Sequence, residues 1–306
     1  MMRGVYIVAN DKVAENAIAL MSSLRFHDPD VPVFLIPFND DHQRVASRLA
    51  ELYGVQLFPD LDFLDALTEQ IGEIFPRDFL ALPNKMRKLA AWFGPLDEFL
   101  YIDTDILFFT PVTDTLAYLD QADFIWCDYH YKRGLEDVFS QVVPAQNIFS
   151  TEALQDVFNS GLWGSKKSVL SLKQLYEVLR DCAAHHEYFD FSSGCTDQPI
   201  MNYLVLSSIE NRCNIAKARD NEPGSWGGST HFIERDHRLF DGDRPLRYLH
   251  WAGTPMRAGG PYRNLWTYYR YLNDSEGKAQ ADEVSPTKPS GLQQLKTGIR
   301  SLLKGR

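Results

Sequence analysis

Alternating strand and helix patterns over the first sixty residues constrain the fold more than any other feature of the chain. Gly4–Ala9 is an apolar run typical of a buried strand, and from Val13 apolar residues recur at helical spacing. A second apolar run, Val31–Ile36, is followed by a helix ending at Tyr53 and by a short strand, Val55–Phe58. This β-α-β-α-β order predicts a parallel sheet with a nucleotide-sized crevice at the carboxyl ends of its strands.

Composition narrows the class of protein. The 306 residues suffice for one large α/β domain or two small ones, and 44% hydrophobic with 24% charged residues is ordinary for a soluble globular protein. The formal charge of −10 argues against nucleic-acid binding. No signal peptide pattern precedes the first strand and no apolar run approaches ~18 residues, so we expect a cytoplasmic body. The scattered cysteines are expected to be core thiols in a reducing compartment: Cys127, Cys182, Cys195 and Cys213.

Two carboxylates interrupt the apolar and aromatic run Phe99–Phe109. Asp103 and Asp105 stand one residue apart, in a stretch that indicates a buried strand, central in a parallel sheet. Ionised carboxylates are costly there unless a partner compensates them. Paired acids with no adjacent Arg or Lys suggest a divalent cation that bridges a phosphate. The alternative is that the two acids cap a turn at the end of the strand.

Candidate partners occur on both sides of this run. Pro83–Phe93 indicates a helix in which Lys85 and Lys88 share a face, either for a phosphate or simply for solvent. Arg247–Gly253 indicates a short strand, and its histidine, His250, is either structural or completes an Asp/Asp/His set for Mn²⁺ or Mg²⁺. Gly224–Gly228 is typical of a mobile loop.

Two further motifs carry polar residues between apolar ones. In Phe158–Gly164, small residues stand between aromatic ones, and glycine could permit close approach of the backbone to a ligand; a plain strand with a bulge is the alternative. Ser192–Pro199 is a loop that runs into a helix, which Thr196 or Asp197 can cap. Capping alone would explain these polar residues.

Taken together and in this order, the motifs resemble those of GT-A glycosyltransferases, most closely family 8, the glycogenin-like retaining enzymes. The resemblance spans roughly residues 3 to 266. The matching positions are the first strand and the loop after it, with Ala9 and Asn10, and then Lys88–Trp92, Asp103–Thr104–Asp105, Phe158–Gly161, Asp197–Gln198 and His250–Gly253.

The resemblance implies a GT-A fold, a Rossmann-like α/β architecture whose mixed, mainly parallel sheet is flanked by helices. It implies a metal site of Asp103, Asp105 and His250 for Mn²⁺ or Mg²⁺, and a UDP-sugar donor. Asn159, Asp197 and Gln198 would orient the transferred sugar, and transfer would proceed with retention. The donor would be bound by Ala9, Asn10, Lys88, Thr104, Gly253 and Arg257.

One position departs from the family pattern. The family usually carries a lysine three residues after the glycine of the histidine motif, where it grips the diphosphate. This chain has Met256 there, and either Arg257 or Arg263 can substitute for the lysine.

Three competing functions use similar motifs. A haloacid-dehalogenase-type phosphatase also carries Asp-x-Asp, but normally with Thr or Val where this chain has Leu107. A sugar-1-phosphate nucleotidyltransferase needs a glycine-rich opening loop, which is absent, as are the dinucleotide and Walker loops. A GT-A protein that binds sugar nucleotides without catalysis is the third; the metal residues argue against it and Met256 argues for it.

The C-terminal segment differs from the body of the chain. We expect a GT-A domain over residues 1–272, a polar linker over 273–291 and a basic amphipathic helix over 292–306. From Lys288 to Arg306 the chain has five basic residues and no acidic one. Such a tail suits peripheral contact with an anionic membrane surface at the cytoplasmic face, and hence a lipid-linked or other glycan acceptor. Docking on the enzyme's own acidic surface, or disorder, is the alternative.

Overall fold

The computed structural model describes residues 1–76, 79–80, 83–192, 194, 197–220, 222–254, 256 and 259–274. It contains one compact unit over Met1–Arg270, and the chain divides from it at Tyr271. The predicted linker beyond Asp274 and the predicted C-terminal helix lie outside the described residues, so the division at residue 272 stays a prediction. In the part of the chain that is described, no helix is both long and apolar enough to span a membrane.

The first unit is built on a seven-stranded sheet with the order β3-β2-β1-β4-β7-β6-β8. All neighbours are parallel except β4–β7 and β6–β7, which confirms the predicted mixed, mainly parallel sheet. Smaller sheets pair β12 with β5 and order the others as β11-β10-β9. The strands are β1 (Arg3–Ala9), β2 (Val33–Pro37), β3 (Gln56–Leu57), β4 (Glu98–Ile102), β5 (Ile106–Phe108), β6 (Phe124–Trp126), β7 (Leu162–Lys166), β8 (Arg212–Asn214), β9 (Ile233–Arg235), β10 (Arg238–Asp241), β11 (Arg244–Pro245) and β12 (Tyr248–His250).

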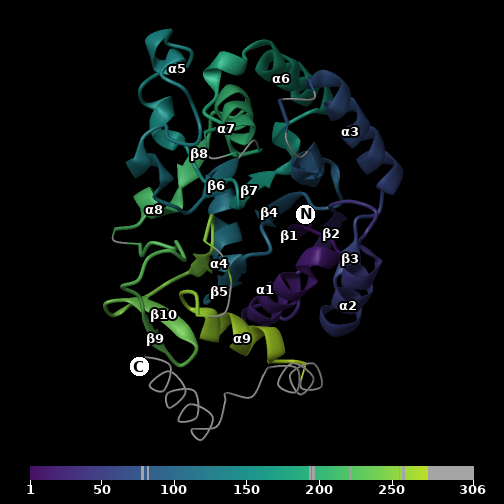
Figure 1. Ribbon diagram of the computed structural model, residues 1–306, viewed down its shortest axis with the longest axis vertical. Helices are drawn as coiled ribbons and strands as arrows, with labels where there is room; N and C mark the ends of the chain where they lie inside the picture. Colours follow the sequence, from purple (N-terminus) through teal and green to yellow (C-terminus); the bar gives the residue numbers. More distant parts are fainter. Residues whose placement is uncertain are drawn as a thin grey trace, which may run out of the picture. The chain divides into compact units, whose positions relative to one another are not determined.

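Helices cover both faces of the sheet because successive strand residues point to opposite sides. Val5, Ile7 and Leu100 pack with α1, α2 and α4, whereas Tyr6 and Tyr101 pack with α3, α6 and α7, the upper group in Figure 1. The α-helices are α1 (Ala14–His27), α2 (Gln43–Tyr53), α3 (Leu61–Ile74), α4 (Thr113–Leu116), α5 (Val142–Ala145), α6 (Leu172–Ala184), α7 (Asp197–Ser208), α8 (Ile215–Ala218) and α9 (Arg263–Tyr271). The predicted β-α-β-α-β opening is therefore confirmed.

Several short stretches are 3-10 helices, which close a hydrogen-bonded turn every three residues. The stretch predicted as a helix over Pro83–Phe93 is one of them, η2. Lys85 and Lys88 share a face of it, since both form ion pairs with Asp197. The others are η1 (Asp11–Val13), η3 (Ala117–Asp120), η4 (His130–Arg133), η5 (Ala153–Asp156), η6 (Lys167–Val169) and η7 (His186–Tyr188).

The prediction of a single strand over Phe99–Phe109 is wrong. The run forms β4 and β5, which belong to different sheets, and the chain turns at Asp103–Asp105 between them. β4 is the central strand of the large sheet, as predicted, and its last residue, Ile102, lies opposite Leu162 of β7. The turn leaves both carboxylates about a third exposed, so their desolvation is only partial and less costly than inside the sheet.

Candidate donor and metal site

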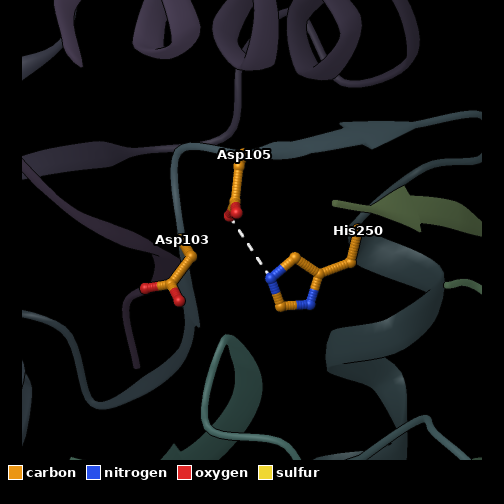
Figure 2. Close-up of side chains that lie close together, drawn as sticks. All are labelled: Asp103, Asp105 and His250. Atoms are coloured by element: carbon orange, nitrogen blue, oxygen red, sulfur yellow. Dashed lines mark ion pairs between the residues drawn. The ribbon is translucent and has the colours of Figure 1, made fainter. Parts of the chain in front are cut away.

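Two carboxylate side chains and one imidazole converge at the carboxyl end of β4. Asp103 and Asp105 come from the turn after β4, and His250 is the last residue of β12. One ligand atom of each lies within 4.8 Å of the others. Figure 2 shows the three side chains directed toward one another, with an ion pair of 3.3 Å between His250 Nε2 and Asp105 Oδ1.

Backbone hydrogen bonds between distant segments bring these three side chains together. β12 runs antiparallel to β5 with His250 opposite Ile106, which brings the histidine alongside the turn. The N–H of Trp251 donates to the carbonyl of Asp105 at 3.1 Å, and the N–H of Asp103 donates to the carbonyl of Gly161 at 2.7 Å. The turn is thus held on both sides by residues next to β7 and β12, which are distant in the sequence.

Gly161 leaves the space in which the three side chains meet. A Cβ atom at this position would lie 2.3 Å from Cε1 of His250 and 2.9 Å from Oδ2 of Asp103. Any side chain would therefore push the imidazole or the carboxylate out of place. Two carboxylates and one imidazole around such a space are a donor set that suits Mn²⁺ or Mg²⁺.

Lys88 carries a buried ammonium group beneath this cluster. Its Nζ donates to Oδ2 of Asp197 at 2.8 Å and to the carbonyl of Ser160 at 3.2 Å, and it lies 3.7 Å from Oδ1 of Asp103. The hydroxyl of Tyr101 donates to the same Asp103 oxygen at 2.5 Å. Lys88 therefore links the group formed by Asp103, Asp105 and His250 to Asp197, the first residue of α7.

Ionisation in the cluster follows from burial and close charges. Burial raises the pKa of Asp103, because desolvation penalises the carboxylate more than Lys88 stabilises it. At Asp105 burial acts in the same direction, but the opposite charge of His250 prevails and lowers the pKa. Burial disfavours the imidazolium of His250, yet Asp105 raises its pKa. The site therefore favours positive charge between its carboxylates.

Asn159, Asp197 and Gln198 form one hydrogen-bonded group beside Lys88. The amide of Asn159 donates to Oε1 of Gln198 at 3.0 Å, and the hydroxyl of Ser160 donates to Oδ2 of Asp197 at 3.1 Å. Burial opposes ionisation of Asp197, but the charge of Lys88, with that of Lys85 at 3.5 Å, lowers its pKa far below the ordinary value. Asp197 is thus a buried carboxylate held in its charged form.

A cavity of about 710 Å³ joins these groups. It extends from the end of β1, through the metal cluster, to the start of α7. The site residues predicted from the sequence that line it are Ala9, Asn10, Lys88, Asp103, Thr104, Asp105, Asn159, Asp197, Gln198, His250 and Gly253. Arg257 lies outside the described residues. The roles assigned to these side chains remain predictions.

Several residues of the cavity wall are not predictable from the motifs. The sequence marks Tyr101 only as part of an apolar strand, although its hydroxyl holds Asp103. His130 and Asp137 belong to an irregular loop without helical or strand periodicity, and both line the cavity. The backbone carbonyl of Asp137 accepts a hydrogen bond from Gln198 at 3.3 Å. The polar-aromatic composition directly after the buried strand Phe124–Trp126 does indicate a loop on the substrate side, but it does not single out these two residues.

Comparison with known proteins identifies the fold. No protein-family model and no curated protein matches the sequence. An active-site mutant of LgtC aligns with a TM-score of 0.60 and 15% identity, over 89% of this chain and 96% of that one. WbbM, a bifunctional glycosyltransferase, aligns at 0.58 and 13%, over 90% and 51%. The glycosyltransferase GlyE of Streptococcus pneumoniae aligns at 0.53 and 15%, over 95% and 66%.

The chain therefore has the GT-A fold of these glycosyltransferases, as the sequence resemblance implied. It spans about half the length of the WbbM chain and nearly all of the LgtC chain. At these identities the likeness concerns the fold, and membership of family 8 stays a prediction.

Proposed function

We propose that this protein is a metal-dependent glycosyltransferase that moves a sugar from a UDP-sugar to a glycan or lipid-linked acceptor with retention. The observation that carries the proposal is the convergence of Asp103, Asp105 and His250 in one cavity with the residues expected to bind a nucleotide-sugar. The GT-A fold supports it, since solved proteins of this fold include WbbM and GlyE, both glycosyltransferases.

The metal site would face the leaving group. Mn²⁺ or Mg²⁺ held by Asp103, Asp105 and His250 would act as a Lewis acid and neutralise charge growing on the diphosphate. Lys88 adds a fixed positive charge that needs no reorganisation during the reaction. The ammonium is hydrogen-bonded to Asp197 and Ser160, which hold it in place. Its positive charge would stabilise the diphosphate electrostatically.

Polar side chains at the start of α7 would hold the transferred sugar. Asp197 and Gln198 are almost fully buried, and both line the cavity. Their side-chain oxygens would therefore accept hydrogen bonds from sugar hydroxyls in a place shielded from bulk water. The negative charge of Asp197 would also stabilise an oxocarbenium-like centre. Asn159 fixes the side chain of Gln198 by its hydrogen bond.

Ala9 and Asn10 would bind the nucleoside at the other end of the cavity. Asn10 is buried at the end of β1, and its side-chain oxygen accepts from the N–H of Lys12 at 3.2 Å. The open edge above parallel strands is where α/β sheets bind nucleotides. Arg257, with Thr104 and Gly253, completes the set of donor-binding residues that we propose.

The location and the acceptor are proposed on the sequence of the tail. We infer a cytoplasmic protein that contacts the inner face of a membrane through residues 292–306 and acts there on a glycan or lipid-linked acceptor. The excess of basic residues at this end of an otherwise acidic chain supports the inference.

Hydrolysis of UDP-sugars in the presence of Mn²⁺ tests the proposal, because it requires donor and metal but no known acceptor. We expect release of UDP from at least one of UDP-glucose, UDP-galactose, UDP-N-acetylglucosamine and UDP-xylose, abolished by chelator. Binding of UDP without hydrolysis of any donor would instead favour the non-catalytic alternative, for which Met256 is the supporting observation.

A further inference from the structure

One tryptophan of the chain is exposed, and it stands beside the metal cluster. The exposed fraction of Trp226 is 55%, whereas each of the other five tryptophans is at most 6% exposed. Exposure of so large an aromatic surface to water is unfavourable, and aromatic side chains of this kind are enriched where proteins bind partners. Trp226 belongs to the loop Gly224–Gly228, which the proposed chemistry does not use.

The loop is fixed to β12 by its backbone. The N–H of His250 donates to the carbonyl of Ser225, and the N–H of Gly227 donates to the carbonyl of His250, both at 2.7 Å. These two bonds form a parallel bridge in which Trp226 is the partner of His250. Paired residues of a bridge project their side chains to the same face, so the indole lies on the face from which the imidazole enters the metal cluster.

The indole itself is held in one orientation. Its Nε1 donates to the carbonyl of Ala252 at 2.9 Å. A Cβ atom on Gly228 would lie only 2.3 Å from Cζ2 of the ring, so the ring rests directly on the backbone of this glycine. Gly228 therefore covers part of the indole, and the Nε1 edge of the ring is hydrogen-bonded to Ala252. An ordered aromatic surface of this kind costs a ligand little conformational entropy.

Trp226 lies at the rim of the cavity and not in its wall. Ala252, which accepts its hydrogen bond, lines the cavity, but the indole does not. A nucleotide-sugar contained in the cavity would be surrounded by the wall residues. The rim instead meets a molecule that enters from outside and protrudes from the site, which is the position of an acceptor in sugar transfer.

We infer that Trp226 is the stacking surface for the acceptor, and that the acceptor presents a pyranose ring to it. The C–H groups on one face of a pyranose are apolar and slightly positive, and they complement the negative face of an indole. The inference rests on the proposed function and deepens it, since it assigns the acceptor side of the same site. Trp226 thus becomes a residue that determines acceptor specificity.

Fluorescence quenching tests the inference with simple glycosides as probes. Because Trp226 is the exposed tryptophan, acrylamide should quench its emission selectively. With Mn²⁺ and UDP present, we expect at least one of methyl β-galactoside, methyl β-glucoside and methyl N-acetyl-β-glucosaminide to reduce this quenching in a saturable way. Trp226→Phe should remove the quenchable component.

Kinetics supply a second readout. We expect Trp226→Ala to lower transfer to the effective methyl glycoside by about tenfold, the factor that corresponds to 1.4 kcal/mol, and to leave UDP-sugar hydrolysis unchanged. Trp226→Phe should retain most transfer because it keeps a ring. Phe26→Ala is the matched control, since Phe26 is also 55% exposed but lies at the far end of α1.

The outcomes separate this inference from the proposed function. Failure of the wild-type protein to hydrolyse any UDP-sugar contradicts the proposed function. If hydrolysis proceeds but no methyl glycoside alters the quenching, the inference is overturned. It is equally overturned if Trp226→Ala leaves transfer intact or lowers hydrolysis and transfer alike, with the thermal midpoint unchanged.

Discussion

At the scale of single residues, the two carboxylates after β4 are the groups on which activity should depend most. Asp103→Asn and Asp105→Asn each remove a charge from the site proposed to hold Mn²⁺ or Mg²⁺. Because bound metal supplies several kcal/mol of transition-state stabilisation, we expect UDP-sugar hydrolysis to fall by at least about a hundredfold. Circular dichroism should show an intact fold.

Asp114→Asn is the control for these variants, since Asp114 is exposed on α4 and does not line the cavity. It should keep wild-type hydrolysis. Full activity of either Asp103→Asn or Asp105→Asn in chelator would refute the metal assignment.

The two lysines of η2 should differ in their effects on both stability and binding. Lys88→Ala leaves the buried carboxylate of Asp197 without its hydrogen-bonded cation, and loss of one partner of a buried pair typically costs about 3–5 kcal/mol. Lys85, about a third exposed, should contribute at most about 1 kcal/mol. We therefore expect Lys88→Ala to show the lower urea midpoint and the weaker UDP affinity.

Urea denaturation and UDP titration of both variants measure these effects. Lys88→Met, which keeps most of the volume, separates loss of charge from loss of packing. The opposite ranking of the two alanine variants would show that Lys85, and not Lys88, is the donor-binding lysine.

At the scale of elements, the residue directly before β7, Gly161, should control whether Asp103 and His250 can bind a metal ion. Gly161→Ala would drive a methyl group into His250 and Asp103. We expect a Mn²⁺ dissociation constant raised by about tenfold or more, the range seen when groups that orient metal ligands are disturbed. Isothermal titration with Mn²⁺ in the presence of UDP measures it.

Gly72→Ala provides the matched glycine control. Gly72 lies within α3, and a Cβ there would meet nothing within 4 Å. Alanine is favoured over glycine in a helix by about 0.5–1 kcal/mol, so this variant should be slightly more stable and bind Mn²⁺ normally. Equal Mn²⁺ affinity of both variants would contradict the role given to Gly161.

The elements also show how far the sequence could predict the structure. The opening strands and helices were predictable because their apolar residues are spaced differently. In the strands these residues alternate or run continuously, whereas in the helices they recur every 3.6 residues. The break between β4 and β5 could be given only as an alternative, a turn at the two acids, because apolar residues continue on both sides of Asp103–Asp105. The 3-10 form of η2 was not predictable either, since spacings of three and four residues overlap in so short a stretch.

The site was partly predictable for the same reasons. Its ligand types stood at strand ends, which is where the topology of a parallel sheet gathers them. The placing of Trp226 depends on pairing with a segment remote in sequence, and no local pattern contains that information. The bond from Tyr101 to Asp103 is local, but the apolar run marks Tyr101 only as a buried strand residue. Their partners, Asp103 and His250, were nevertheless identified.

At the scale of the whole molecule, donor binding should stabilise the fold. UDP with Mn²⁺ should raise the thermal midpoint, because a ligand that binds only the folded state stabilises it, by about 2.7 kcal/mol at a hundred times its dissociation constant. GDP and CDP at equal concentration should raise it less. Stabilisation by GDP or CDP but not by UDP would show that the assignment of the base pocket is wrong.

The tail gives a separate prediction for the molecule as a whole. Full-length protein should co-sediment with anionic vesicles at low salt, since each basic residue near such a surface contributes about 1 kcal/mol. The chain truncated after Asn273 should not, and neutral vesicles should bind neither form. Equal binding of the two forms to anionic vesicles would remove the membrane part of the proposal.

The pairing of β5 with β12 has a consequence for how the protein is made. Lys88, Asp103 and Asp105 are synthesised early, and His250 follows about 145 residues after Asp105, near the end of the first unit. Contacts between segments so distant form late, because the entropy of closing the intervening loop must be overcome first. A ligand of the proposed site can therefore assist no early step of folding. A ligand of the proposed site would recognise a chain only after β12 has been added, so its binding would report in a single event that β12 is present and paired with β5.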